Sequence, residues 1–172
     1  MPDARPAKRL TPWPWSCWRK RLLQGWQVEI IATDLNDRSV EVAKAGIYGD
    51  YALRNTTDYF KRKYLQPASD HKLQVRDEVK KLVSFSRVNL QDDSRMLFMK
   101  GIDIVFCCNV LIYFDAVSKT RVVDHFFSNL NLGGYFFLGT SESLLGLSSR
   151  FHLVHFPGAI GYWKPSLKGG KP

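Results

Sequence analysis

The chain has 172 residues, of which 45% are hydrophobic, so it is long enough for one globular domain with a sizeable core. Its formal net charge is +9, but the first 26 residues hold six of the 25 Lys and Arg residues against the single acid Asp3, and the remainder is only mildly basic. Binding to nucleic acid through charge is therefore disfavoured, and no apolar run approaches the ~20 residues of a membrane span.

The three cysteines, Cys17, Cys107 and Cys108, favour a reducing compartment. They cannot form an even set of disulfides, and two adjacent cysteines do not readily bridge each other. The N-terminus lacks a clean apolar core with a small-residue cleavage site. We therefore expect a soluble, cytoplasmic protein without membrane insertion. Cys107 and Cys108 lie in an apolar stretch and are expected to be inert core thiols.

The first elements follow an α/β pattern. Residues 28–33 (VEIIAT) predict a strand, a polar turn follows, and residues 39–45 predict a helix that ends at Gly46. A second, short helix is expected over residues 56–65. Strand, turn and helix in this order are typical of the start of an α/β unit.

Two short strands are predicted next, at residues 72–79 (KLQVRDEV) and 80–90 (KKLVSFSRVNL). They are close together in sequence, so they could pair as an antiparallel hairpin or form a small subdomain beside the main sheet.

The second half of the chain continues the alternation. Residues 102–109 (IDIVFCCN) predict a parallel strand buried on both faces, and residues 115–132 have helical spacing. Gly133 and Gly134 are expected to stop this helix before a buried strand at YFFLGT, and residues 150–165 predict an antiparallel hairpin. The pattern indicates an α/β protein built on a parallel sheet.

Polar side chains follow three of the predicted strands, where ligands of open α/β sheets bind. Asp34 ends the first strand, and a carboxylate there can accept hydrogen bonds from both hydroxyls of a ribose, although it could equally cap a helix or form a turn. Asn89 and Asn109 each end a later strand and could contact an adenine or an amino-acid group, or only satisfy nearby backbone. Together the three predict a nucleoside-sized pocket.

Other polar residues are less informative. Tyr113 could bring a phenol to the mouth of that pocket or only pack its ring with the hydroxyl in water. Glu142 could line the same edge, with capping as the favoured role. His125, His152 and His155 lack metal spacing with Cys or acidic partners, so no metal site is predicted.

A family resemblance rests on motifs that contain these residues. ATDLN, the AGIY turn, the DYF helix, VNL, FCCNVLIYFD, LNLGGYFFLGTSESL and a final FHLV...YW occur in the order and spacing of the CheR family, the chemotaxis-receptor glutamate methyltransferases. The resemblance runs from about residue 28 to residue 164. NVLIYFD and GGYFFLGTSE are its most specific parts.

The resemblance implies a Rossmann-like class I methyltransferase fold. It also implies transfer of a methyl group from S-adenosylmethionine to glutamate side chains of receptor cytoplasmic domains, which leaves S-adenosylhomocysteine. A monomer is expected. Carried over by motif, the cofactor would be held by Asp34 at the ribose hydroxyls, Asn89 and Leu90 at the adenine, and Asn109 and Val110 along the pocket, with Asn109 and Tyr113 as the catalytic residues, Tyr113 near the transferring methyl.

The resemblance further assigns about residues 66–88 to an inserted antiparallel β-subdomain that helps to dock receptors, within a methyltransferase domain of residues 27–172. One departure concerns Cys108, because the family commonly has an arginine immediately before the Asn of NVLIYF. The loss of that cation puts the orientation of the target carboxylate in question. An alternative is therefore a catalytically inactive relative that binds a receptor or signalling partner.

The first 26 residues form an aberrant segment, with four of the five Trp and four of the eight Pro residues. Members of the family have there a strand and glycine-rich turn similar to GCATGEEAYSLAM, after a helical N-terminal domain. Back-translation of residues 2–19 and translation in one other frame permits GCATGEEAYSLAMVLLA, with Arg9 taken as an AGR codon. We therefore hypothesise that residues 2 to about 20 are an out-of-frame translation of the cofactor loop. The alternative is a genuine divergent N-terminus. The sheet is expected to be incomplete at its first strand.

Overall fold

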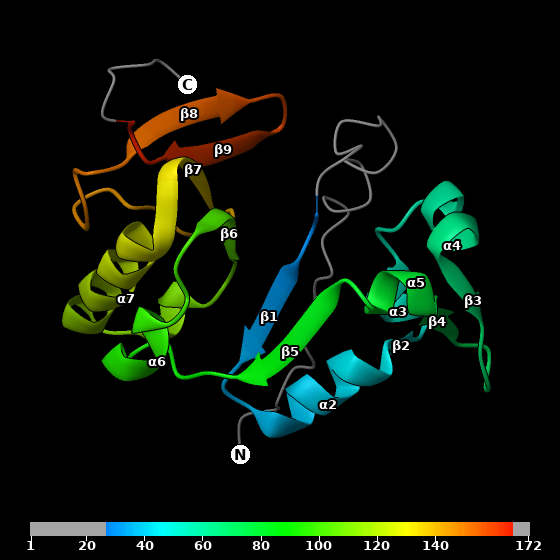
Figure 1. The fold of residues 1–172 in the computed structure, drawn as a ribbon. Helices are drawn as coiled ribbons and strands as arrows, with labels where there is room; N and C mark the ends of the chain where they lie inside the picture. The colour runs from blue at the N-terminus through cyan, green and yellow to red at the C-terminus, as the bar shows by residue number, and fades with distance from the viewer. Residues whose placement is uncertain (1–26, 167–172) are drawn as a thin grey trace. The chain divides into compact units, whose positions relative to one another are not determined.

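The computed structural model describes residues 27–166, which divide into two compact units between Val88 and Asn89 (Figure 1). The segment 1–26 lies outside the described residues, and so do the expectations for its structure. No helix within the described range is long and apolar enough to cross a membrane.

The first unit contains five short strands and four helices. Their bounds are β1 (Ile30–Asp34), α2 (Asp37–Ala45), β2 (Ile47–Tyr48), α3 (Asp50–Leu53), α4 (Asp58–Tyr64), β3 (Leu65–Pro67), β4 (Leu73–Val75), α5 (Asp77–Lys80) and β5 (Val83–Arg87).

Helix α2 has the ends that the sequence predicts. The Asn36 side chain accepts a hydrogen bond from the backbone N–H of Arg38, which satisfies one of the donors that a helix start leaves open. At the other end Gly46 adopts the left-handed conformation with φ 65°, and its N–H donates to Val42 O. A residue with a Cβ would be strained at that φ, so a glycine suits the position where the helix ends.

Strands β1 and β5 form a two-stranded parallel sheet, with Ile30 opposite Val83 and Asp34 opposite Arg87. The predicted antiparallel hairpin between residues 72–79 and 80–90 is therefore wrong. The β-strand of the second segment pairs with β1, and three of the eight residues of the first segment lie in the helix α5. The alternation of half-buried and exposed residues in β5 fits either pairing, so the sequence pattern alone could not choose the partner.

Between β1 and β5 in the sequence, a small antiparallel sheet forms in the order β2-β4-β3. Its apolar cluster consists of the buried Leu53, Leu65 and Val75, with Tyr48, Leu73 and Val79 packed against them. This sheet starts at residue 47, earlier than the predicted subdomain, and β5 at the end of the predicted range belongs to the other sheet.

The second unit has a four-stranded sheet in the order β6-β7-β9-β8, with β6 and β7 parallel and the others antiparallel. The predicted C-terminal hairpin is confirmed as β8 and β9. The elements are α6 (Asp93–Leu97), β6 (Ile102–Cys107), the 3₁₀ turn η1 (Leu111–Tyr113), α7 (Ala116–Asn129), β7 (Leu130–Leu138), β8 (His152–Phe156) and β9 (Ala159–Trp163).

Helix α7 lies beside the sheet of the second unit (Figure 1), and its apolar stripe packs against β7. Val122 and Val123 are fully buried, and the ring of Phe126 lies 5.2 Å from that of Phe136 on β7. The prediction that Gly133 and Gly134 stop the helix is wrong, because α7 ends at Asn129 and both glycines lie within β7.

The end of α7 is fixed by a residue far along the chain. The Lys164 ammonium donates to the carbonyl oxygens of Phe127 and Leu130, at 2.6 and 2.7 Å, and so satisfies acceptors that the helix end leaves open. Sequence periodicity within the helix contains no sign of this contact.

Strand β6 is buried on one face and not on both, contrary to the prediction. Val105 and Cys107 are buried, whereas Ile104 and Phe106 are each 41% exposed. The chain is nevertheless α/β with parallel and antiparallel strands, which confirms the predicted fold class.

Candidate functional site

Asp34 is the last residue of β1 and is half-buried. One of its carboxylate oxygens accepts a hydrogen bond from the backbone N–H of Asn36, at 2.8 Å, so Asp34 does form the turn after β1. Within residues 27–166, the other oxygen has no hydrogen-bond partner in the structure. A carboxylate in this state keeps acceptor capacity for a ligand hydroxyl.

Asn89 follows β5 after one intervening residue. The N–H of Val88 donates to the carbonyl oxygen of Asp34, at 3.1 Å, so the chain leaves the β1–β5 edge directly beside Asp34. The Asn89 side chain is exposed, and its oxygen accepts from the N–H of Gln91 at 3.0 Å. This is the local-backbone role that the sequence left open, and it still leaves the amide N–H₂ of Asn89 as a donor.

Asn109 follows β6 and has a backbone φ of 57°, uncommon for a residue with a side chain. Val110 is half-buried, and the next residues form the turn η1, with Tyr113 N–H donating to Val110 O at 3.2 Å. Tyr113 is 77% exposed. The structure therefore brings Asn109, Val110 and Tyr113 together in one short segment, at the carboxyl end of a parallel strand.

Glu142 holds this segment in place. One of its carboxylate oxygens accepts from the N–H groups of Asn109 (2.6 Å) and Gly139 (3.0 Å). The other accepts from Val110 (2.9 Å) and Ile112 (3.3 Å). One carboxylate thus satisfies four backbone donors, of the charge-assisted kind that is stronger than a neutral hydrogen bond.

Gly139 is required for this arrangement. A Cβ at residue 139 would lie 2.8 Å from the Glu142 carboxylate and 3.0 Å from the nitrogen of Asn109, closer than such atoms approach. The sequence analysis favoured capping for Glu142 but gave no hint that it caps the segment after another strand. Its position shortly after the end of β7 could have indicated this role, because the parallel neighbours β6 and β7 end at the same edge of the sheet.

The six predicted site residues are divided between the two units. Asp34 belongs to the first unit, and Asn89, Leu90, Asn109, Val110 and Tyr113 belong to the second. The grouping of all six into one pocket stays a prediction. Within residues 27–166, no group of three or more His, Cys, Asp or Glu side chains could hold a metal ion.

Cys107 is buried beside this segment, and burial, followed by the charge of Glu142, raises the pKa of its thiol to about 12. At pH 8 only about one thiol in ten thousand would then be ionised, and the thiolate is the reactive form.

We therefore expect native Cys107 not to react with a disulfide reagent at pH 8. Replacing Cys107 by serine should leave the number of thiols that react in the native chain unchanged and lower the number in urea by one. Cys108, which is half-buried, provides the comparison through the Cys108→Ser variant. A lower native count in Cys107→Ser would contradict the expectation.

Comparisons with known proteins identify the family of the chain. Residues 18–160 match the model of the family described as CheR methyltransferase, SAM binding domain. The chain is 35% identical to chemotaxis protein methyltransferase 2 of Vibrio cholerae, over 84% of this chain and 52% of that protein. It is 42% identical to the chemotaxis protein methyltransferase of Vibrio parahaemolyticus, over 77% of this chain and 48% of the relative.

Among solved structures, the chain resembles the N-methyltransferase NodS from Bradyrhizobium japonicum in complex with S-adenosylhomocysteine. The TM-score is 0.49 and the identity 13%, over 80% of this chain and 67% of the other. The chain spans about half the length of the curated relatives that it matches. The family model covers most of this chain, and its domain is the one that binds S-adenosylmethionine. The chain therefore belongs to the CheR methyltransferases, whose cofactor is S-adenosylmethionine.

Proposed function

We propose that the chain is the catalytic part of an enzyme that methylates glutamate side chains in the cytoplasmic domains of chemotaxis receptors. The products would be a glutamate methyl ester and S-adenosylhomocysteine, and the enzyme would act as a monomer. The observation that carries the proposal is the segment Asn109–Tyr113, which Glu142 holds at the carboxyl ends of the parallel strands β6 and β7. Ligands of open α/β sheets bind at such ends.

The residues suit a nucleoside. The oxygen of Asp34 that has no partner within residues 27–166 would accept from the ribose hydroxyls, and the N–H₂ of Asn89 with the backbone of Leu90 would meet the adenine edge. Asn109 and Val110 would line the wall beside the sulfonium end. Glu142 already accepts hydrogen bonds from the N–H groups of Asn109 and Val110. These two residues would therefore contact the cofactor through their side chains and carbonyl oxygens.

The reaction needs little from acid or base groups. S-adenosylmethionine supplies an activated methyl group on a sulfonium, and a glutamate carboxylate is already ionised and nucleophilic at neutral pH. The work of the chain is to align the carboxylate with the methyl group and to exclude water. Tyr113, with its exposed phenol three residues after Val110, would orient the incoming carboxylate through a hydrogen bond.

Residues 2 to about 20 enter the proposal as an out-of-frame translation of the cofactor loop, so that this chain binds cofactor weakly and transfers methyl groups slowly. The small sheet β2-β4-β3 would dock the receptor. Cys108 favours a second candidate, a catalytically inactive module that binds a receptor or signalling partner, because it stands where the family commonly has an arginine.

The test is a titration of the full chain with S-adenosylhomocysteine, followed by two-dimensional NMR, together with an assay of methyl transfer to receptor cytoplasmic fragments. We expect weak, saturable binding and a product that releases methanol in alkali, as a carboxylate ester does. Receptor binding without any cofactor binding would support the inactive module, and an alkali-stable methyl product would contradict glutamate as the target.

Asp34→Asn tests the ribose contact. Asparagine keeps an oxygen for the N–H of Asn36 but removes the charge, so we expect about tenfold weaker binding of S-adenosylhomocysteine. Asp37→Asn, an exposed carboxylate in the first turn of α2, is the matched control and should bind as the unmodified chain does. Equal affinity for the two variants would exclude Asp34 from the site.

A further inference from the structure

The segment between β5 and α6 makes most of its hydrogen bonds within itself. Asn89 O accepts from the N–H of Asp92 at 3.0 Å, and the Asp92 carboxylate caps α6 by accepting from Ser94 and Arg95. These contacts fix the shape of the turn. They do not attach it to the rest of the second unit.

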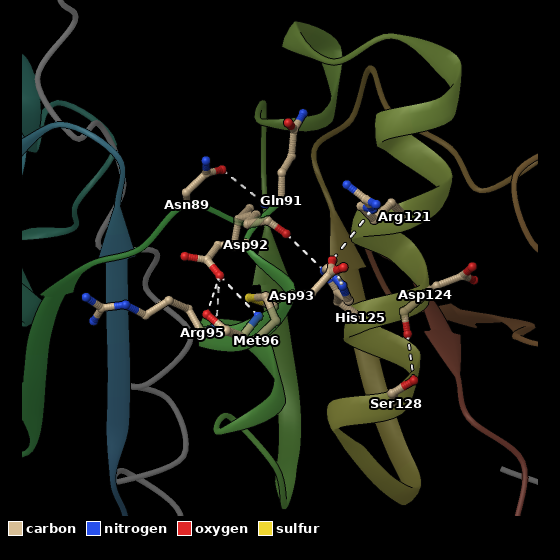
Figure 2. A network of polar contacts seen from close by, with 12 residues as sticks. Asn89, Gln91, Asp92, Asp93, Arg95, Met96, Arg121, Asp124, His125 and Ser128 are labelled. Carbon is tan, nitrogen blue, oxygen red and sulfur yellow. Dashed lines mark hydrogen bonds and ion pairs between the residues drawn. The ribbon is translucent and has the colours of Figure 1, made fainter.

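The attachment comes from one face of α7, where Arg121, His125 and Asn129 are spaced four residues apart. Figure 2 shows Arg121 and His125 on this face. Asn129, which is buried, donates to Met96 O at 2.9 Å and holds the last turn of α6. Arg121 lies 3.6 Å from the Asp93 carboxylate. His125 makes the contact to the segment itself.

The imidazole of His125 bridges two acceptors. Its Nδ1 lies 3.0 Å from the carbonyl oxygen of Leu90, and its Nε2 lies 3.0 Å from the Asp93 carboxylate. The carbonyl oxygen of Leu90 can only accept, so Nδ1 donates to it, and Nε2 faces the Asp93 carboxylate. Its side chain is 18% exposed, and the charged groups around it are Asp93 on α6 with Arg121 and Asp124 on α7, Asp124 itself being paired with Arg150.

We infer that His125 is a positioning residue of the cofactor site, which fixes the carbonyl of Leu90 and thereby the backbone that would meet the adenine. This inference rests on the proposed function. His125 would not touch the cofactor. It acts through the single hydrogen bond from Nδ1 to Leu90, while the contact of Nε2 with the Asp93 carboxylate holds the ring in this orientation.

Two substitutions separate the two bonds. The amide nitrogen of asparagine lies near the place of Nδ1, so His125→Asn can keep the bond to Leu90 and lose the one to Asp93. The amide nitrogen of glutamine lies near the place of Nε2, so His125→Gln can keep Asp93 and lose Leu90. His155 on β8 is exposed, so His155→Gln is the control for replacing a histidine by glutamine.

The experiment is a titration of each full-length variant with S-adenosylhomocysteine by NMR, with thermal unfolding and amide exchange of residues 90–93 measured on the same samples. We expect about tenfold weaker binding and faster exchange for His125→Gln, and an affinity within about threefold of the unmodified chain for His125→Asn and His155→Gln. A purely structural role would weaken binding in parallel with stability in both His125 variants.

Equal affinities for His125→Asn and His125→Gln would overturn the inference while the proposed function stands. Failure of the unmodified chain to bind S-adenosylhomocysteine at any concentration would overturn the proposed function, and the inference with it. If His125→Gln does not fold, a His125→Asn chain that folds but binds as weakly as an Asp34→Asn chain likewise overturns it.

Discussion

Replacement of Glu142 by glutamine is expected to lower the free energy of unfolding by about 2 kcal/mol and to weaken cofactor binding at least tenfold. The carboxylate accepts four backbone hydrogen bonds, two on each oxygen. Glutamine offers one oxygen and one N–H₂ group, so two of the four donors would face another donor. An unpartnered donor in a half-buried place costs about 1–3 kcal/mol.

The loss of affinity has a geometric cause. Without Glu142, nothing else in the described part of the chain accepts from the N–H groups of Asn109 and Val110, and the positive φ of Asn109 is unfavourable without such support. The segment that carries the proposed catalytic residues would then sample other conformations. Urea unfolding and titration with S-adenosylhomocysteine measure the two effects separately.

Asp115→Asn is the matched control for Glu142→Gln. The Asp115 carboxylate also accepts from a backbone N–H, that of Ser118 at the start of α7, and this hydrogen bond holds the pKa of Asp115 below its usual value. Asparagine caps a helix about as well as aspartate, so we expect a change within about 0.5 kcal/mol. Similar losses in Glu142→Gln and Asp115→Asn would show that Glu142 has no special role.

Local signals in the sequence predicted most elements of the fold. The helix α2, its end at Gly46, the C-terminal hairpin and the buried stripe of α7 follow from caps, turns and periodicity, all of which act within a few residues. The motifs also predicted the family, which the comparisons confirm. What local signals could not give was the partner of β5, because strand pairing depends on residues more than fifty positions away.

The site shows the same limit. The positions of Asp34, Asn89 and Asn109 after their strands are predictable from the strands themselves. The contacts that hold the neighbouring backbone are made by Glu142, from beyond β7, and by His125, on α7, each more than thirty residues away in sequence. A histidine in a helical stripe carries no sequence mark of such a contact, and the place of Glu142 after β7 indicates the edge of the sheet but not the backbone groups that it holds.

Restoring the other reading frame is expected to have the largest effect on function. A chain in which residues 2–18 are replaced by GCATGEEAYSLAMVLLA should bind S-adenosylhomocysteine about a hundredfold more tightly than the present chain. A glycine-rich turn at a helix start offers backbone N–H groups to the ligand, and two charge-assisted bonds of about 1.5 kcal/mol each give that factor. Pro12 and Pro14 have no N–H to offer in a sheet or to a ligand.

The control for this replacement is a chain with the same seventeen inserted residues in scrambled order, which matches composition and charge but not the strand and turn. The same three chains are compared for methyl transfer to receptor fragments. We expect the restored chain to be well above the scrambled chain and the present chain in activity. Equal affinity and activity in the restored and scrambled chains would refute the out-of-frame hypothesis. So would a gene that reads without interruption through this stretch and has no start upstream in the other frame. In either case residues 2–20 would be a genuine divergent segment, and they would not supply a glycine-rich turn to the cofactor.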